Sequence, residues 1–185
     1  MDHRLLCKDE TFIPAGTSSV DLAKFMPGDS TGETRRRAAV DDANLQIELY
    51  EPGSVKHRLY ALQKALINLP DVEFPLQHTF APGVYARTIF IPAGSVLVGK
   101  IHKHRHLNIL SMGHVSVLTE GGGLEDLHGP ITMVSEPGTK RAVQAHSDVV
   151  WTTIHLTNET DLAKIEDEVI AKTFDDYVKF LGVSK

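Results

Sequence analysis

Cysteine is almost absent from this sequence, and long apolar runs are missing altogether. Cys7 is the one cysteine among 185 residues. No disulfide can therefore form within the chain, and a reducing cytoplasm is the expected location. Residues 1–10 lack the apolar core of a secretion signal, and no stretch approaches the roughly 20 apolar residues of a membrane-spanning helix. We therefore expect a cytoplasmic protein with no membrane partner.

An excess of positive charge is also missing. The chain has 24 acidic and 19 basic residues, for a formal net charge of -5, whereas a general nucleic-acid binder carries a basic face. The sequence contains no phosphate-binding glycine loop, no nucleophile elbow and no paired-cysteine zinc site. These absences argue against a nucleic-acid partner and against an organic cofactor.

The chain has enough apolar material for one domain, and its patterning divides it into four segments. Residues 1–53 form a polar arm, expected to add strands to a sheet or to pair with a partner chain, with strand-like alternation at residues 45–50. Residues 54–83 contain a predicted helix, capped by Ser54 and stopped by Pro70, and then a linker. Residues 84–156 form the predicted barrel. Residues 157–185 hold the predicted C-terminal helices, the first with Leu162, Ile165, Val169 and Ile170 on one face and a shorter one at residues 175–181.

The barrel is predicted from apolar residues that alternate with polar ones from residue 84 onward. Eight short runs follow, at residues 84–91, 95–101, 107–111, 114–118, 123–128, 131–134, 141–144 and 149–156. Turn-forming residues separate them, and many short strands at this rhythm are typical of a sandwich, jelly roll or barrel. The predicted fold class is all-β, with one helix before the barrel and one or two after it.

Three histidines lie within five residues, at His102, His104 and His106. Alternate side chains of an extended strand share a face, so all three imidazoles are expected to point the same way. A face that presents several neutral nitrogens suits a divalent metal such as zinc, iron, manganese or nickel. The alternative is an exposed, half-charged strand with Lys103 and Arg105 on its other face.

Two segments resemble the sequence motifs of the cupin superfamily. Residues 91–94 with residues 102–113 resemble the first motif, and Pro137–Arg141 resembles the second. The resemblance implies a double-stranded β-helix. Within the superfamily, the chain looks like a group of uncharacterised proteins often encoded by bacteriophages and prophages, at Phe80–Tyr85, His106–Ile109, Pro137–Arg141 and Trp151–His155. That group implies no activity, and it would make the host cytoplasm the location.

The first motif aligns in two registers. Counting back from the hairpin glycine Gly113 puts His106 at the usual glutamate position, His102 at the second histidine and Lys100 at the first. Counting forward from His102 and His104 puts Asn108 at the glutamate position instead. We favour the first register, because its hairpin length agrees with the family.

The second motif has Arg141 where the family has a histidine. A guanidinium cannot donate a lone pair to a metal, but it can hold a carboxylate or phosphate. His155 offers a replacement ligand, because it shares a strand face with Trp151 and Thr153. We therefore predict His102, His106 and His155 as metal ligands, with His104 as the alternate. The competing interpretation of His155 is a core histidine with hydrogen-bonded ring nitrogens.

Five residues are predicted to contact a small-molecule ligand: Arg141, Tyr85, Arg87, Trp151 and Asn108. Tyr85 and Arg87 alternate on one strand at the expected barrel mouth, where small ligands commonly bind, although packing and solvation explain them about as well. His114 and His128 flank turns and are expected to face solvent. Glu120–Asp126 is expected to form a hairpin turn rather than an acid–base pair.

The sequence therefore predicts a metal-binding cupin with a small-molecule pocket inside the barrel. As an enzyme it would fit oxygenase, isomerase or lyase chemistry on a small polar substrate. The alternative is a non-enzymatic, metal-free cupin that binds a sugar or other small ligand, or a phage assembly or accessory protein. We expect a homodimer, because exposed strand edges tend to be paired or covered.

Overall fold

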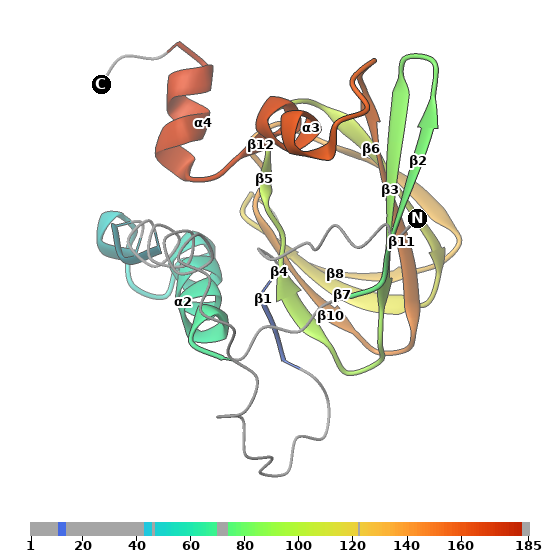
Figure 1. The fold of residues 1–185 in the computed structure, drawn as a ribbon. Coiled ribbons are helices and arrows are strands. Elements are labelled where there is room, and N and C mark those ends of the chain that lie inside the picture. Colours follow the sequence, from blue (N-terminus) through green and yellow to red (C-terminus); the bar gives the residue numbers. More distant parts are fainter. Residues whose placement is uncertain (1–10, 14–42, 46, 70–73, 122, 183–185) are drawn as a thin grey trace, which may run out of the picture.

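The computed structural model describes residues 11–13, 43–45, 47–69, 74–121 and 123–182, and its centre is a barrel of two antiparallel sheets (Figure 1). The first sheet has the order β1 (Thr11–Ile13), β4 (Val96–Val98), β10 (Arg141–Ala145), β7 (His114–Thr119) and β8 (Leu124–His128). The second has the order β2 (Leu76–Ala81), β3 (Val84–Ile91), β11 (Val149–Leu156), β6 (His106–Met112) and β9 (Ile131–Ser135).

The strand order is that of a jelly roll. Without the outer strands β1 and β2, one sheet is β4-β10-β7-β8 and the other is β3-β11-β6-β9. The chain crosses from one sheet to the other at every connection between these strands except the β7–β8 hairpin. Eight strands in two such sheets form the double-sheet jelly roll that cupins share with other proteins. The predicted barrel is therefore confirmed, although the helices make the whole chain β-rich rather than purely β.

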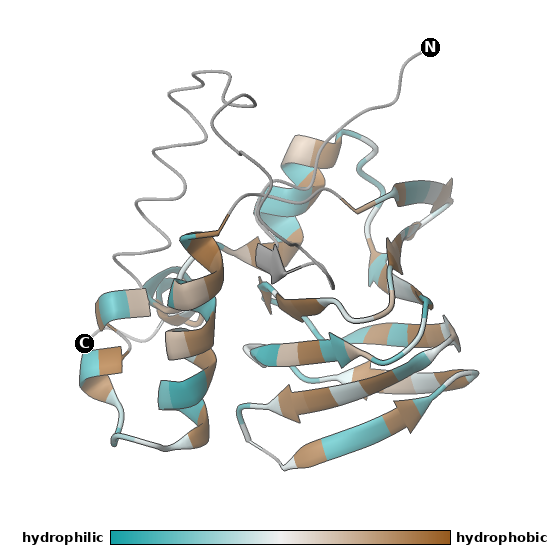
Figure 2. Cartoon of the chain, turned by 90° about the horizontal axis from the view of Figure 1, so that it is seen from below, coloured by the Kyte–Doolittle hydropathy of each residue, from teal (hydrophilic) through white to brown (hydrophobic). Residues whose placement is uncertain are grey.

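Side chains of alternate residues fill the barrel, because successive residues of a strand point to opposite faces. Figure 2 shows this alternation of hydrophobic and hydrophilic residues along the strands. The inward residues form one apolar cluster: Phe74, Ile89, Ile91, Leu97, Leu110, Val115, Val117, Val143, Ala145, Val149 and Trp151. This cluster fills only part of the barrel, and polar residues line the rest.

Helices cover one outer face and one end of the barrel. In α2 (Val55–Ile67), the Ser54 hydroxyl accepts a hydrogen bond from the His57 amide at 3.2 Å, as predicted for the cap. Leu59 and Leu66 of this helix pack on Val98 and Ala142, on the outside of β4 and β10. None of the described helices is long and apolar enough to cross a bilayer.

Two further helices follow β11, the last barrel strand. Helix α3 (Leu162–Val169) lies across the barrel end at which β5 (Ile101–His102) pairs with β12 (Ile170–Ala171) (Figure 1). Ile165 and Val169 of α3 pack against Tyr85 of β3. Helix α4 (Phe174–Phe180) follows. Both helices were predicted, but Ile170 begins β12 instead of ending the helix.

Two expectations before the barrel were wrong. Residues 43–45 and 47–49 are helical, although residues 45–50 were predicted to alternate as a strand. Leu45 and Leu49 are four residues apart, a spacing that fits a helix face equally well. Strand β2 lies within the predicted linker. Residues 11–13 of the arm form β1, which pairs with β4 in the first sheet, whereas residues 1–10, with Cys7, and residues 14–42 lie outside the described residues.

Candidate metal centre

The barrel interior changes from apolar to polar along β11. Trp151 pairs with Ile89 and Leu110 on the neighbouring strands. Two residues further on, Thr153 pairs with Arg87 and Asn108, and His155 then pairs with Tyr85. The polar layers therefore lie at the barrel end that α3 covers.

Three histidines converge in these polar layers. One ring nitrogen from each of His102, His106 and His155 lies within 4.8 Å of the others. The ring centroids are 4.1 Å apart for His102 and His106, 5.0 Å for His102 and His155, and 4.9 Å for His106 and His155. The three side chains come from β5, β6 and β11, so the folded barrel brings together residues that are 53 positions apart.

His104 lies outside this group, contrary to the expectation that three alternating histidines share a face. Residues 103 and 104 form a bend between β5 and β6, so the strand is interrupted there. The His104 side chain is exposed and meets the edge of the Phe180 ring at a centroid distance of 5.2 Å. The alternate metal ligand therefore faces α4 rather than the barrel interior.

The hydrogen bonds of His102, His106 and His155, called the interior triad below, leave nitrogen lone pairs available for a metal. The His104 carbonyl oxygen lies 2.9 Å from Nδ1 of His106. A carbonyl only accepts, so Nδ1 carries the proton and Nε2 of His106 keeps its lone pair. Nδ1 of His102 is buried with no hydrogen-bond partner among the described residues. Such a nitrogen is costly to leave unsatisfied, and coordination of a metal ion would satisfy it.

The protonation states of the triad also fit metal binding. Burial lowers the pKa of His155 to about 3, and the neighbouring His106 adds to this effect. Burial also lowers the pKa of His102 well below 6.5, helped by the other two histidines and by the charges of Arg87 and Arg141. The pKa of His106 is lowered by burial as well. All three imidazoles are therefore neutral at neutral pH, the form that binds metals.

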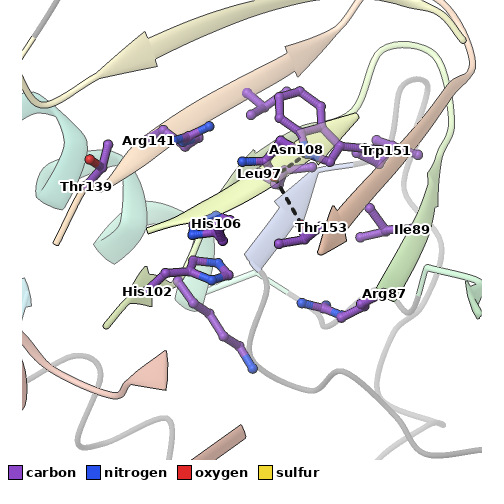
Figure 3. A pocket seen from close by; sticks show the side chains of 14 residues that line it. Arg87, Ile89, Leu97, His102, His106, Asn108, Thr139, Arg141, Trp151 and Thr153 are labelled. Atoms are coloured by element: carbon purple, nitrogen blue, oxygen red, sulfur yellow. Dashed lines mark hydrogen bonds between the residues drawn. The ribbon is translucent and has the colours of Figure 1, made fainter. Parts of the chain in front are cut away.

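Two small pockets adjoin the triad, and both are lined by Arg87, Lys100, His102 and Thr153. The inner pocket has a volume of about 70 Å³ and reaches His106, Arg141 and Trp151 (Figure 3). The outer pocket has a volume of about 170 Å³ and reaches Tyr85, His155 and α3. Drug-sized ligands occupy roughly 300–1,000 Å³, so these pockets suit a smaller molecule.

Arg141, from β10, lines the inner pocket. Its Nη2 donates a hydrogen bond to the Ser135 hydroxyl at 2.6 Å. Burial lowers the pKa of this guanidinium, and the charge of Glu125 opposes the shift only in part. Arg87 lines both pockets from β3, so two guanidinium groups, together with the Lys100 ammonium group, line the space beside the histidines.

Asn108 lines the inner pocket, but its amide is already engaged. Its oxygen accepts hydrogen bonds from Nε1 of Trp151 at 2.8 Å and from the Thr153 hydroxyl at 3.1 Å (Figure 3). Its nitrogen donates to the Ser135 hydroxyl. Asn108 thus braces three strands rather than offering a free ligand atom. This arrangement favours the register with His106, not Asn108, at the glutamate position.

Three residues that line these pockets were not predicted as site residues: Lys100, Thr153 and His78. Lys100 was noted only at the position of the family's first histidine, and it forms an ion pair with Glu166 of α3 at 2.8 Å. Thr153 was used only to place His155. His78 lies in the unpredicted strand β2, where its Nδ1 is 2.7 Å from the Tyr85 hydroxyl. The one available signal in the sequence was Lys100, which stands where the family's first motif has its first histidine.

No family model and no curated protein match the chain. It is similar to the solved structure of ectoine synthase from P. lautus, with 14% identity over 54% of this chain and 75% of that chain and a TM-score of 0.45. It is similar to an RmlC-like cupin family protein with a double-stranded β-helix fold from Methanocaldococcus jannaschii (11% identity, 45% and 79% covered, TM-score 0.39). A Cupin 2 conserved barrel domain protein from Salinispora arenicola is also similar (12% identity, 48% and 79% covered, TM-score 0.39). We assign the fold of this chain from its own strand order, which is that of the cupin-type jelly roll.

Proposed function

We propose that this protein binds a divalent metal ion through His102, His106 and His155 and holds a small anionic ligand beside it. The convergence of the three neutral imidazoles carries the proposal. Three protein ligands leave coordination positions open for water or a substrate, as catalytic sites require. The chemistry that a bound metal would supply is polarisation of a ligand oxygen or redox chemistry.

The charges around the triad support an anionic ligand. Arg87 and Arg141 face the pockets, and the one acidic residue among the described lining residues, Glu166, is paired with Lys100. Guanidinium groups hold carboxylates through paired hydrogen bonds. A small carboxylate that touches both the metal and Arg141 fits this arrangement best. Oxygenase, isomerase or lyase activity on such a substrate is the enzymatic form of the proposal.

The competing proposal is a metal-free cupin that binds a sugar or another small ligand, including a phage assembly or accessory role. It is supported by the lack of the family's glutamate and second-motif histidine, whose positions hold His106 and Arg141. It requires the three histidines to be satisfied by hydrogen bonds alone. The unsatisfied Nδ1 of His102 counts against that requirement.

Trp151 provides the test of the ligand class. It is the only tryptophan of the chain and lines the inner pocket, so its fluorescence reports on that space. Small carboxylates titrated into metal-loaded protein are expected to change this fluorescence in a saturable way, whereas neutral sugars are not. Arg141→Gln should weaken carboxylate binding by about 10-fold or more, since a charge-assisted hydrogen bond contributes about 1.5–3 kcal/mol.

Two comparisons make this test decisive. Arg58→Gln removes a guanidinium from α2, outside both pockets, and should bind carboxylates like the unaltered protein. Equal binding by Arg141→Gln and the unaltered protein would contradict the anion site. Saturable binding of neutral sugars to metal-free protein would favour the competing proposal.

A further inference from the structure

A second group of histidines lies on the outside of the barrel, where the function proposed above does not use it. His114 begins β7 and pairs with His128, the last residue of β8. His146 follows β10, and its amide donates to the His114 carbonyl at 2.8 Å. Asp126 lies two residues before His128, on the same face of β8. Three adjacent strands therefore bring three imidazoles and a carboxylate to one edge of the sheet.

The side chains of this group contact one another closely. The ring centroids of His114 and His128 are 3.9 Å apart, and those of His114 and His146 are 4.5 Å apart. Nε2 of His114 lies 2.7 Å from one Asp126 oxygen, and Nε2 of His128 lies 3.6 Å from the other. The Ser116 hydroxyl connects Nε2 of His146, at 2.6 Å, to Asp126, at 3.3 Å.

We propose that His114, His128 and Asp126 form a second metal site on the outer face of the barrel, with His146 beside it. One ligand atom from each of the first three residues lies within 4.8 Å of the others. Ligand atoms of a tetrahedral zinc site are roughly 3.3 Å apart, given zinc–nitrogen distances near 2.0–2.1 Å. The required movement is small, and the side chains have room for it, because His128 is 67% and Asp126 is 60% exposed.

The composition of the group selects the kind of metal. Imidazole nitrogens with one carboxylate suit zinc and related transition metals, whereas magnesium and calcium prefer all-oxygen sites. The group lies outside the two pockets beside the interior triad. A metal here would tie the ends of β7 and β8 together. We therefore infer a structural site, which stabilises the fold by binding only the folded chain.

The test is a zinc titration of untagged, metal-free, full-length protein. The unaltered chain should bind one more zinc ion than the double variant Asp126→Asn/His128→Gln, whatever the interior triad binds. The affinity at the outer site should fall by more than about 100-fold, because even residues that only orient metal ligands contribute about 10- to 100-fold. Zinc should also raise the midpoint of thermal unfolding more in the unaltered chain than in the variant.

Two further variants separate this site from the interior one. His57→Gln, on α2, removes a histidine from elsewhere on the surface and should keep the full zinc count. His155→Gln should lose only the interior ion. An equal zinc count and affinity in the unaltered chain and the double variant would overturn the outer site. The outer site would also be overturned if the unaltered chain bound a single zinc ion that His155→Gln loses and the double variant keeps.

Discussion

The three histidines inside the barrel link stability to pH. Burial lowers their pKa values in the folded chain, that of His155 to about 3, whereas an unfolded histidine titrates near 6.5. Below pH 6.5 the unfolded chain therefore binds more protons than the folded chain, so the free energy of unfolding falls as the pH falls. The expected slope is about 1.4 kcal/mol per pH unit for each fully affected histidine.

Urea unfolding of metal-free protein between pH 6.5 and about 5 measures this slope. His155→Gln should reduce it, because glutamine does not titrate, whereas His57→Gln on α2 should leave the contribution of the triad in place. A slope that is the same in His155→Gln and the unaltered protein would show that His155 is protonated in the folded state.

Asn108 is expected to matter for stability rather than for ligand contact alone. Asn108→Ala removes the acceptor of the Trp151 indole and the donor to Ser135, inside a wall where Asn108 is only 3% exposed. Leaving a buried donor unsatisfied costs about 1–3 kcal/mol. The measurement is the free energy of unfolding in urea. Asn68→Ala provides the comparison, because the Asn68 amide is exposed and bonds only its own helix. A loss for Asn108→Ala no larger than for Asn68→Ala would contradict the bracing role.

The register of the histidines could be read from the sequence because a glycine fixed it. Gly113 has a φ of 105°, and a Cβ there would lie 2.5 Å from the Asp148 carbonyl oxygen, so the β6–β7 turn requires glycine. Counting from Gly113 placed His102 and His106 inside the barrel. His104 was misplaced because the bend at residues 103 and 104 contains no proline or glycine that would reveal it in the sequence.

At the scale of whole elements, the barrel strands were predictable and their surroundings less so. Apolar residues at a period of two and frequent turn residues marked the eight runs between residues 84 and 156, although the run at residues 95–101 divides into β4 and β5. Strand β2 escaped prediction because it is mostly exposed, and only Leu76 and His78 of its six residues are half-buried. Its contribution to the site, His78, could not be found for the same reason.

Helix α3 covers the polar end of the barrel, and the contribution of its N-cap residue, Asp161, to stability can be tested. Asp161 accepts hydrogen bonds from the amides of Ala163 and Lys164 at 2.9 and 3.3 Å. Asp161→Ala should cost about 0.5–2 kcal/mol, and α3 should fray from its first turn, where two backbone amides lose their acceptor. Hydrogen exchange should therefore quicken across Leu162–Val169 and stay unchanged in β6 and β11. Uniform quickening across the barrel would contradict the independent opening of α3.

At the scale of the whole molecule, the homodimer remains a prediction. The outer face of the second sheet exposes apolar side chains of three adjacent strands, Leu107 on β6, Val134 on β9 and Leu156 on β11. Exposed apolar groups of this kind mark association surfaces. We expect light scattering to give twice the mass of one chain, and Leu156→Asp to reduce it. A single-chain mass for the unaltered protein at all concentrations would contradict the dimer.

Metal content tests the central claim most directly. Untagged protein should contain zinc, iron, manganese or nickel in an amount that falls by one ion per chain in His106→Ala, whose lost imidazole points at His102 and His155. His104→Gln should keep that ion, because His104 lies outside the barrel. Circular dichroism and urea unfolding establish that both variants fold. An unchanged metal content in folded His106→Ala, or no uptake by the unaltered protein from any of the four metals, would contradict the metal centre.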